Sequence, residues 1–288
     1  MKRNKALNIS GGTGVFAVIG YPIEHSLSPA MHNAAIGKLG IDCVYVPFRV
    51  VPGELRMAVE GFRAAGIRGL NVTIPHKQRI MNYLDSVDGL ARRIGAVNTV
   101  VNRKGKLAGY NTDAYGFLKP LRKLRRLGNS TVFVFGAGGA ARAIVYSLLT
   151  QKVGRIYITD RDNARAARLA REMKTRKAVY VKYDNSTVRD IAGKADILVN
   201  ATNTGMSRGD PLLIDPRCLK KGALVYDIVY NRETELVKKA RARGIKCLDG
   251  VDMFVNQGAV SLEYWTGRKA PLDVMYRVVR NKLRKERR

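Results

Sequence analysis

Two segments of the chain carry side chains that are able to transfer protons. In the first, Thr73, His76 and Lys77 follow an apolar stretch that Pro75 stops, and in the second Asp113 follows another apolar stretch. An ammonium and a carboxylate form an acid–base pair when they meet at the carboxyl edge of an α/β sheet, where such sheets bind ligands. We therefore predict proton transfer by Lys77 and Asp113, with an ordinary solvated lysine as the alternative.

Three further polar residues are candidates for binding a substrate. Asn98 lies in the run Gly95-Ala-Val-Asn98-Thr99, and Ser26 and Ser28 precede the start of a helix. A helix N-terminus attracts anions, so the two serines are candidates for holding a carboxylate. The ordinary alternative is that Ser28 only caps the helix, and from the residues alone we predict the cap.

A glycine-rich segment follows a continuous apolar strand and leads into a helix. It consists of Gly136, Ala137, Gly138, Gly139, Ala140 and Ala141. Its pattern is G-x-G-x-x-G/A, in which glycines permit a tight turn and let backbone amides approach a pyrophosphate at the positive end of the helix. With its strand, its helix and an acid at the end of the next strand, this segment predicts a dinucleotide site, and a merely glycine-rich turn is the alternative.

The residues after the next strand leave the choice of dinucleotide open. Asp160 ends that strand, where a carboxylate accepts hydrogen bonds from the ribose hydroxyls of NAD and repels a 2′-phosphate. Arg161 and Arg165 follow it, and a guanidinium there holds the 2′-phosphate of NADP. Asp162 again favours NAD, and the alternative is that these charges only solvate the start of a helix.

Alternating strand and helix patterns must position these side chains, and they predict the α/β class. A helix is expected from Ser28 to Gly40 and another from Pro52 to Gly66, and a hairpin is expected around Lys104 and Gly105. Later helices are expected near 253–265 and from Leu272 onward. The expected strands are Val15–Ile19, the strand with Val44, Val46 and Phe48 on one face, Ile67–Thr73, Thr99–Val101, Leu107–Tyr110, Thr131–Phe135, Arg155–Thr159, Ala178–Val181, Asp196–Asn200 and Leu224–Val229.

The composition and the hydrophobic pattern of the chain change at two places. Near residue 116 a basic helix with Lys119, Arg122, Lys123, Arg125 and Arg126 precedes the breakers Gly128, Asn129 and Ser130, and after Gly250 the pattern becomes helical. We predict one domain from residues 1–115 with 251–288 and a Rossmann-type, doubly wound domain from residues 116–250.

Composition and charge limit the classes of protein to which the chain could belong. The chain has 288 residues, 46% of them apolar, which is enough for two packed domains. Lys and Arg number 52 against 23 acids, a formal charge of +29. A nucleic-acid-binding protein is therefore the rival hypothesis, based on the basic runs Lys119 to Arg126 and Arg277 to Arg288. Solvated helix faces explain these runs more simply, and no nucleic-acid partner is expected.

Other compositional signals argue against metal, disulfide and membrane proteins. The three cysteines, Cys43, Cys218 and Cys247, form no CxxC pair, which favours the reducing cytoplasm. The three histidines have irregular spacing, so we predict no metal site. No apolar stretch reaches the roughly 18 residues of a membrane span, and no secretory signal is recognisable.

Taken in order, the motifs of the chain resemble those of the shikimate dehydrogenase family, including its quinate/shikimate relatives. The match runs nearly end to end, and many motifs in one order are far less expected by chance than any one alone. The motifs are Tyr21-Pro-Ile, Ser26-Leu-Ser28-Pro, Asn71-Val-Thr-Ile-Pro-His-Lys77, Gly95-Ala-Val-Asn-Thr99, Tyr110-Asn-Thr-Asp113, Gly136-Ala-Gly-Gly139, Asn200-Ala-Thr202, Gly205-Met206, Asp227-Ile-Val-Tyr230-Asn231, Met253 and Gln257-Gly-Ala259.

The resemblance implies an activity and roles for named residues. It implies reversible reduction of 3-dehydroshikimate to shikimate with NAD(P)H, in chorismate and aromatic amino-acid biosynthesis, by an N-terminal α/β substrate domain and a dinucleotide domain. Lys77 would serve the proton transfer and Asp113 would orient it, while hydride passes between the nicotinamide and C3. The implied substrate-binding residues are Ser26, Ser28, Thr73, Asn98, Asp113, Gln257 and Tyr230.

The resemblance also implies the cofactor contacts and the partners. The implied cofactor-binding residues are Gly136, Ala137, Gly138, Gly139, Ala140, Asp160, Arg161, Arg165, Thr202, Tyr230, Gly250 and Met253. NADP is favoured by the family, and Asp160 leaves NAD open, because NADP-dependent members usually read Asn-Arg-Thr where this chain reads Asp160-Arg161-Asp162. An NAD-preferring quinate/shikimate dehydrogenase is the alternative, and a cytoplasmic monomer or homodimer is expected.

Overall fold

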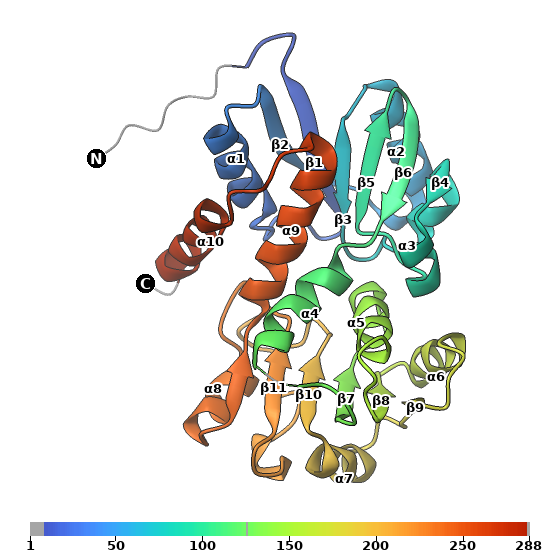
Figure 1. The fold of residues 1–288 in the computed structure, drawn as a ribbon, viewed down its shortest axis with the longest axis vertical. Helices are drawn as coiled ribbons and strands as arrows, with labels where there is room; N and C mark the ends of the chain where they lie inside the picture. The colour runs from blue at the N-terminus through green and yellow to red at the C-terminus, as the bar shows by residue number, and fades with distance from the viewer. Residues whose placement is uncertain (1–8, 125, 287–288) are drawn as a thin grey trace.

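The computed structural model describes residues 9–124 and 126–286, which form two α/β halves, each built on a six-stranded sheet (Figure 1). The sequence-based expectation of an α/β fold is confirmed. Arg125, Arg287 and Arg288, which belong to the two predicted basic runs, lie outside the described residues.

The first sheet is mixed and has the strand order β2-β1-β3-β5-β6-β4. Strand β1 pairs in parallel with β2 and β3, whereas β5 is antiparallel to both β3 and β6. The expected hairpin is confirmed as β5 and β6, which meet at Lys104 and Gly105. The strands are β1 (Gly14–Gly20), β2 (Cys43–Arg49), β3 (Gly69–Val72), β4 (Ser86–Val87), β5 (Thr99–Arg103) and β6 (Lys106–Tyr110).

Helices from both ends of the chain cover this sheet. From the N-terminal part come α1 (Ser28–Leu39), α2 (Leu55–Ala64) and α3 (Gly89–Ile94), with 3₁₀ turns at Pro52–Glu54 and Arg79–Tyr83. The C-terminal helices α9 (Gly250–Thr266) and α10 (Leu272–Glu286) return to the same half (Figure 1). Trp265 of α9 anchors this return, because its indole N–H donates to the Val100 carbonyl at 2.9 Å and its ring stacks on Phe16.

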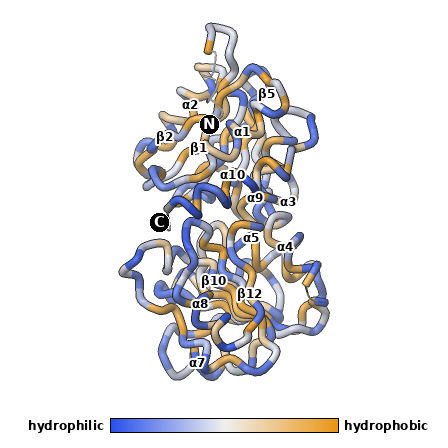
Figure 2. The backbone as a smooth tube through the Cα atoms, turned by 90° about the vertical axis from the view of Figure 1, so that its left-hand side faces the viewer, coloured by the Kyte–Doolittle hydropathy of each residue, from blue (hydrophilic) through white to orange (hydrophobic). Residues whose placement is uncertain are grey.

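The second sheet is parallel throughout, with the order β12-β11-β10-β7-β8-β9. Its central strand β7 is buried from Val132 to Phe135, as expected for a strand covered on both faces, and Figure 2 shows hydrophobic strands at the centre of this half. The strands are β7 (Thr131–Phe135), β8 (Arg155–Thr159), β9 (Ala178–Tyr180), β10 (Ile197–Asn200), β11 (Leu224–Asp227) and β12 (Lys246–Leu248). The helices are α5 (Gly139–Leu149), α6 (Asn163–Glu172), α7 (Asn185–Lys194) and α8 (Glu235–Ala242), with a 3₁₀ turn at Pro216–Cys218.

Helix α4 (Asp113–Leu124) connects the two sheets and packs against both α5 and α9. It begins three residues after β6 ends and carries the predicted basic side chains Lys119, Arg122 and Lys123. Residue 116 lies inside this helix and residue 250 begins α9, so both predicted boundaries fall at elements that connect the halves. The exact division into domains at these positions stays a prediction.

One local expectation is wrong, because Ser28 does not cap α1. The cap position is Leu27, whose backbone is already helical and whose carbonyl accepts the first helical hydrogen bond, from Met31 N–H at 3.1 Å. Ser28 is therefore the first residue inside the helix, and its own N–H donates to Ser26 Oγ at 3.3 Å. The Ser28 hydroxyl is thus not used for capping.

Candidate active site

Lys77 and Asp113 lie together between the two sheets. The Lys77 Nζ donates to Asp113 Oδ2 at 2.6 Å, and the two side chains are only 13% and 5% exposed. The backbone of Lys77 is held as well, because its carbonyl accepts a hydrogen bond from Val97 N–H at 2.8 Å. A solvated surface lysine, the alternative raised by the sequence, does not fit this burial.

Asn98 is the hydrogen-bonding centre beside this pair. Its Nδ2 lies 2.9 Å from both Thr112 Oγ1 and Asp113 Oδ1 and 3.2 Å from Gln257 Oε1. Its Oδ1 accepts from Thr112 N–H at 2.7 Å, and Gln257 Nε2 donates to the Phe254 carbonyl. Because the side-chain amides of Asn98 and Gln257 are held by the backbone, the second oxygen of the Asp113 carboxylate faces a fixed donor.

A close crossing of α4 and α9 brings Asp113 and Gln257 to this point. At Gly116 of α4, a β-carbon would lie 2.7 Å from the Met253 carbonyl oxygen and 2.9 Å from Gln257 Cβ. Any larger residue would push the helices apart, so glycine here is required for the approach. The site therefore depends on two residues that are far apart in the chain.

The remaining predicted substrate residues are Thr73 after β3, Ser26 and Ser28 at the start of α1, and Tyr230 after β11. Thr73 directly follows β3, and its N–H donates to the Ile19 carbonyl. The Tyr230 hydroxyl lies beside Ser26, its ring stacks on Phe254 with the centroids 4.0 Å apart, and burial raises the pKa of the hydroxyl to about 12. Tyr230 therefore remains an uncharged phenol across the physiological range and links the second half to the serines.

The glycine-rich segment forms the turn between β7 and α5. Gly136 has a φ of 109°, and Gly138 occupies the cap position of α5 with no side-chain cap, so the first amides of the helix are available to an anion. A β-carbon on Gly139 would lie 2.8 Å from Lys77 Cβ. The turn thus presents backbone amides next to the Lys77 side chain, which is a fitting cradle for a dinucleotide.

The two acidic side chains after β8 accept hydrogen bonds from backbone amides of the protein, whereas Arg165 borders the glycine-rich turn. Asp160 accepts hydrogen bonds from Ala137 N–H at 2.7 Å and from Asp162 N–H at 3.0 Å, and Asp162 caps α6 by accepting from Arg165 N–H at 3.0 Å. Arg161 is exposed, and Arg165 Nη2 lies 3.2 Å from the β-carbon position of Gly138. Positive charge therefore lies beside the glycine-rich turn, where it favours a 2′-phosphate.

Three predicted cofactor residues lie on loops and helix ends around the second sheet. Thr202 donates to Asn200 Oδ1 at 2.7 Å, Gly250 begins α9 against the Ile228 carbonyl, and Met253 is buried in the core of the second half. These contacts are structural, so a cofactor role for the three stays a prediction. The structure does bring Met253 within about one helical turn of Gln257 on α9.

Sequence reasoning missed a set of buried polar residues beneath Asn98. Asn71, Thr99 and Ser261 are at most 6% exposed and are hydrogen-bonded to one another, and the Tyr45 hydroxyl donates to Asn71 Oδ1 at 2.7 Å. The available signal was a polar residue, Asn71, between Leu70 and Val72 in an otherwise apolar strand. Buried polar groups need partners, so such a residue indicates a network.

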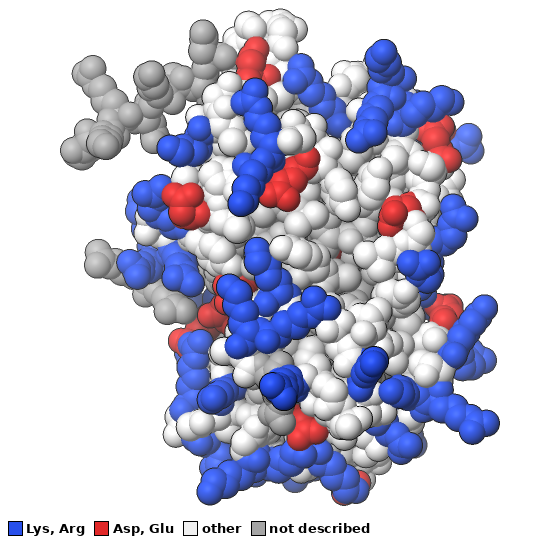
Figure 3. Space-filling model, in the orientation of Figure 1, with Lys and Arg blue, Asp and Glu red and all other residues white. Residues whose placement is uncertain are grey.

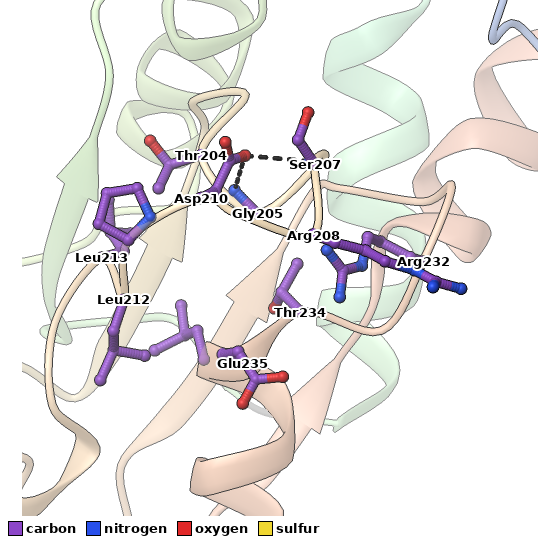
Figure 4. A pocket seen from close by; sticks show the side chains of 12 residues that line it. Thr204, Gly205, Ser207, Arg208, Asp210, Leu212, Leu213, Arg232, Thr234 and Glu235 are labelled. Atoms are coloured by element: carbon purple, nitrogen blue, oxygen red, sulfur yellow. Dashed lines mark hydrogen bonds between the residues drawn. The ribbon is translucent and has the colours of Figure 1, made fainter. Parts of the chain in front are cut away.

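A small cavity of about 10 Å³ lies beneath the loop after β10 (Figure 4). Asp210 points into this loop and accepts hydrogen bonds from Gly205 N–H at 2.7 Å and Ser207 N–H at 3.1 Å. This volume is about enough for one water molecule, and none of the predicted site residues lines it. It therefore belongs to the packing of the loop.

Basic side chains cover both halves of the face shown in Figure 3, with few acids among them. The charge is spread over the two halves instead of being gathered on one helix. Within the described residues, no group of three or more His, Cys, Asp or Glu side chains has the arrangement of a metal site. The helices in this part of the chain are also too short or too polar to cross a membrane.

The parallel sheet with its glycine turn, and the buried Lys–Asp pair beside it, define a two-domain dinucleotide-dependent oxidoreductase. Three family models match the chain in order: the shikimate dehydrogenase substrate binding domain at residues 18–100, shikimate / quinate 5-dehydrogenase at 120–239, and the shikimate 5′-dehydrogenase C-terminal domain at 250–280. A shikimate dehydrogenase (NADP(+)) from Moorella thermoacetica is 42% identical over 95% of both chains. The chain belongs to the shikimate dehydrogenase family.

Solved structures agree with this assignment. The shikimate dehydrogenase of Aquifex aeolicus is 40% identical, with a TM-score of 0.88 over 94% of this chain and 99% of that one. That of Thermus thermophilus, in complex with NADP(H) and shikimate, is 34% identical, with a TM-score of 0.84 over 94% and 100%. A quinate dehydrogenase from Corynebacterium glutamicum in complex with NAD is 32% identical, with a TM-score of 0.85 over 93% and 99%.

Proposed function

We propose that the chain catalyses the reversible, NADP-dependent reduction of 3-dehydroshikimate to shikimate. The observation that carries this proposal is the Lys77–Asp113 pair, buried at 2.6 Å and bordered on one side by Asn98 and Gln257 and on the other by the glycine-rich turn. A polyhydroxylated ring fits between amide and hydroxyl groups, and its reacting oxygen fits beside an ammonium.

Each residue then has a chemical task. Lys77 Nζ gives a proton to the oxygen of the ring carbonyl during reduction and takes it back during oxidation. Asp113 holds the ammonium through Oδ2, while Oδ1 is fixed by Asn98. Ser26 and Ser28 hold the substrate carboxylate, with Tyr230 beside Ser26, and Thr73, Asn98 and Gln257 bind ring hydroxyls. The bound dinucleotide supplies the hydride.

NADP is the cofactor that the site favours. Gly136 and Ala137 shape the turn, the backbone amides of Gly138, Gly139 and Ala140 bind the pyrophosphate, and Arg161 and Arg165 bind the 2′-phosphate. The carboxylate of Asp160 is held in place by backbone hydrogen bonds to both of its oxygens, and Arg161 and Arg165 supply the positive charge that attracts a 2′-phosphate. Where the family pattern reads Asn-Arg-Thr, this chain reads Asp160-Arg161-Asp162, so the arginine in the middle of the pattern is kept.

The decisive experiment is a steady-state assay at the nicotinamide absorbance band with shikimate or quinate and with NADP or NAD. We expect turnover of shikimate with a higher kcat/KM for NADP than for NAD. A quinate rate comparable to the shikimate rate would make this chain a quinate/shikimate dehydrogenase. No turnover with any of the four combinations of substrate and cofactor would contradict the proposal.

A further inference from the structure

The hydroxyl of Tyr45 lies at the centre of the buried network under the substrate site. Tyr45 is in β2, is 1% exposed, and donates to Asn71 Oδ1 at 2.7 Å. Burial raises the pKa of this hydroxyl well above its usual value, so it keeps its proton and remains a donor to Asn71. The side chain of Ser28 lies beside the same oxygen and favours its ionised form, but less strongly than burial disfavours it.

From Asn71 the network continues to the proton-transferring pair. Asn71 Nδ2 lies 3.0 Å from Ser261 Oγ and 3.2 Å from the Asn98 carbonyl oxygen. Thr99 Oγ1 lies 2.8 Å from Ser261 Oγ and 3.2 Å from Asn98 Oδ1, and Asn98 in turn donates to Asp113. An unbroken series of hydrogen bonds therefore runs from Tyr45 to Asp113, and Ser28 lies beside the Tyr45 end of this series.

The ring of Tyr45 is fixed by stacking. His32 of α1 lies parallel to it with ring centroids 4.4 Å apart, and Trp265 lies 6.0 Å away. His32 is fully buried, neither of its ring nitrogens has a hydrogen-bond partner among the described residues, and burial lowers its pKa to about 3. The imidazole of His32 is thus uncharged at neutral pH. Because it is stacked on the Tyr45 ring, the Tyr45 hydroxyl has little freedom to move away from Ser28 and Asn71.

We propose that Tyr45 is a positioning residue that sets the spacing between the carboxylate-binding and the hydroxyl-binding ends of the substrate site. It touches neither substrate nor cofactor and acts through Ser28 on one side and Asn71 on the other. This proposal rests on the proposed function, since it assumes that Ser28 holds the substrate carboxylate. Its effect falls on the binding of the substrate and leaves the binding of the dinucleotide unchanged.

The test compares two isosteric variants that each remove one buried phenolic oxygen. Tyr45→Phe deletes the joining hydroxyl, whereas Tyr226→Phe in β11 deletes a buried hydroxyl that has no hydrogen-bond partner in the described part of the chain. For Tyr45→Phe we expect the KM for shikimate to rise about tenfold, as for the loss of about 1.4 kcal/mol of binding, while the KM for NADP changes less than about twofold. Tyr226→Phe should leave both KM values unchanged.

A KM does not depend on the fraction of enzyme that is folded, so a moderate loss of stability in Tyr45→Phe does not obscure this result. A double-mutant cycle with Ser28→Ala adds a readout that a merely structural role would not move. If Tyr45 acts partly through Ser28 and partly through Asn71, the KM for shikimate of the double variant is above that of Ser28→Ala but clearly below the product of the two single effects. Independent, multiplying effects would overturn the proposal, as would an unchanged KM in Tyr45→Phe.

Failure of this proposal is distinguishable from failure of the proposed function. A wild-type enzyme that does not turn over shikimate would contradict the function itself. A wild-type enzyme that does, together with a Tyr45→Phe variant that loses thermal stability but keeps its KM for shikimate, would contradict only the positioning role.

Discussion

The two sides of the candidate active site are built in different ways. The substrate side consists of buried side chains from several segments, with Asn98 bonded to Thr112, Asp113 and Gln257. The cofactor side is one continuous turn from Gly136 to Gly139 that offers backbone amides, flanked by Arg165. In the proposed function, side chains held by tertiary contacts recognise the small ring, whereas local backbone geometry binds the pyrophosphate.

The largest effect should come from removing the ammonium on the substrate side. We expect Lys77→Ala to lower kcat by about 10²–10⁴-fold, because positioned proton transfer contributes about this much. The KM for NADP should change little, since Lys77 meets the turn only through its apolar stem. Lys38→Ala, an exposed lysine on α1, is the control for loss of a positive charge. An unchanged kcat in Lys77→Ala would contradict the role of Lys77 in proton transfer.

On the cofactor side, we expect side-chain charge to contribute to the binding of only one group, the 2′-phosphate of NADP. We expect Arg161→Gln with Arg165→Gln to lower kcat/KM with NADP by about 100-fold, because charge-assisted hydrogen bonds contribute about 1.5–3 kcal/mol each. The value with NAD should remain within about threefold. Arg168→Gln, exposed on the same helix α6, is the matched control. An equal loss with both dinucleotides would show that the arginines do not select the 2′-phosphate.

Acidification should affect the two halves in opposite directions. His32 on the substrate side has its pKa lowered to about 3, so the unfolded chain takes up a proton below its usual value of 6.5 and the folded chain does not. The stability contributed by neutral His32 is complete above pH 6.5 and is lost as the pH falls toward 3, by about 2 kcal/mol at pH 5. Urea unfolding at pH 7 and pH 5 should show a smaller loss of stability in His32→Phe than in the wild type.

Asp227 in the second half is the comparison of opposite sign. Burial raises its pKa to about 6, so the stability that comes from its protonated form is complete below 3.8 and is lost as the pH rises through about 6. Asp227→Asn should therefore make the loss of stability on acidification steeper than in the wild type. Identical pH profiles for the wild type and His32→Phe would contradict the assignment of His32 as a buried neutral ring.

The smallest effect should come from adding one methyl group to the turn. In Gly136→Ala a β-carbon would meet the Ala201 carbonyl oxygen at 2.7 Å, on a residue with a φ of 109°. We expect a loss of stability of about 1–2 kcal/mol and a higher KM for NADP, with the KM for shikimate unchanged. Gly128→Ala, which is exposed and would meet no heavy atom within 4 Å, is the control. Equal melting temperatures and KM values for the two variants would contradict the backbone argument.

The local elements followed closely from the sequence. Strands β7 and β8 have the predicted bounds, and α1 and the β5–β6 hairpin were also expected. Three short elements, α3, β4 and β12, were not predicted, because six, two and three residues are too few to show a period. Ser28 was wrongly assigned as a cap, since one residue of difference at a helix start decides between a cap and a first turn.

Sequence alone determined the α/β class, the glycine-rich turn and the presence of Lys77, Asn98 and Asp113 at strand and helix ends, because each is set by residues that are near one another in the chain. Tertiary structure alone decided that Gln257 of α9 meets Asn98, that the carboxylate of Asp160 is bound to backbone amides, and that the Tyr45 hydroxyl donates to Asn71. These contacts form between distant segments, and only the packing of α4, α9 and the two sheets brings their atoms within hydrogen-bonding distance.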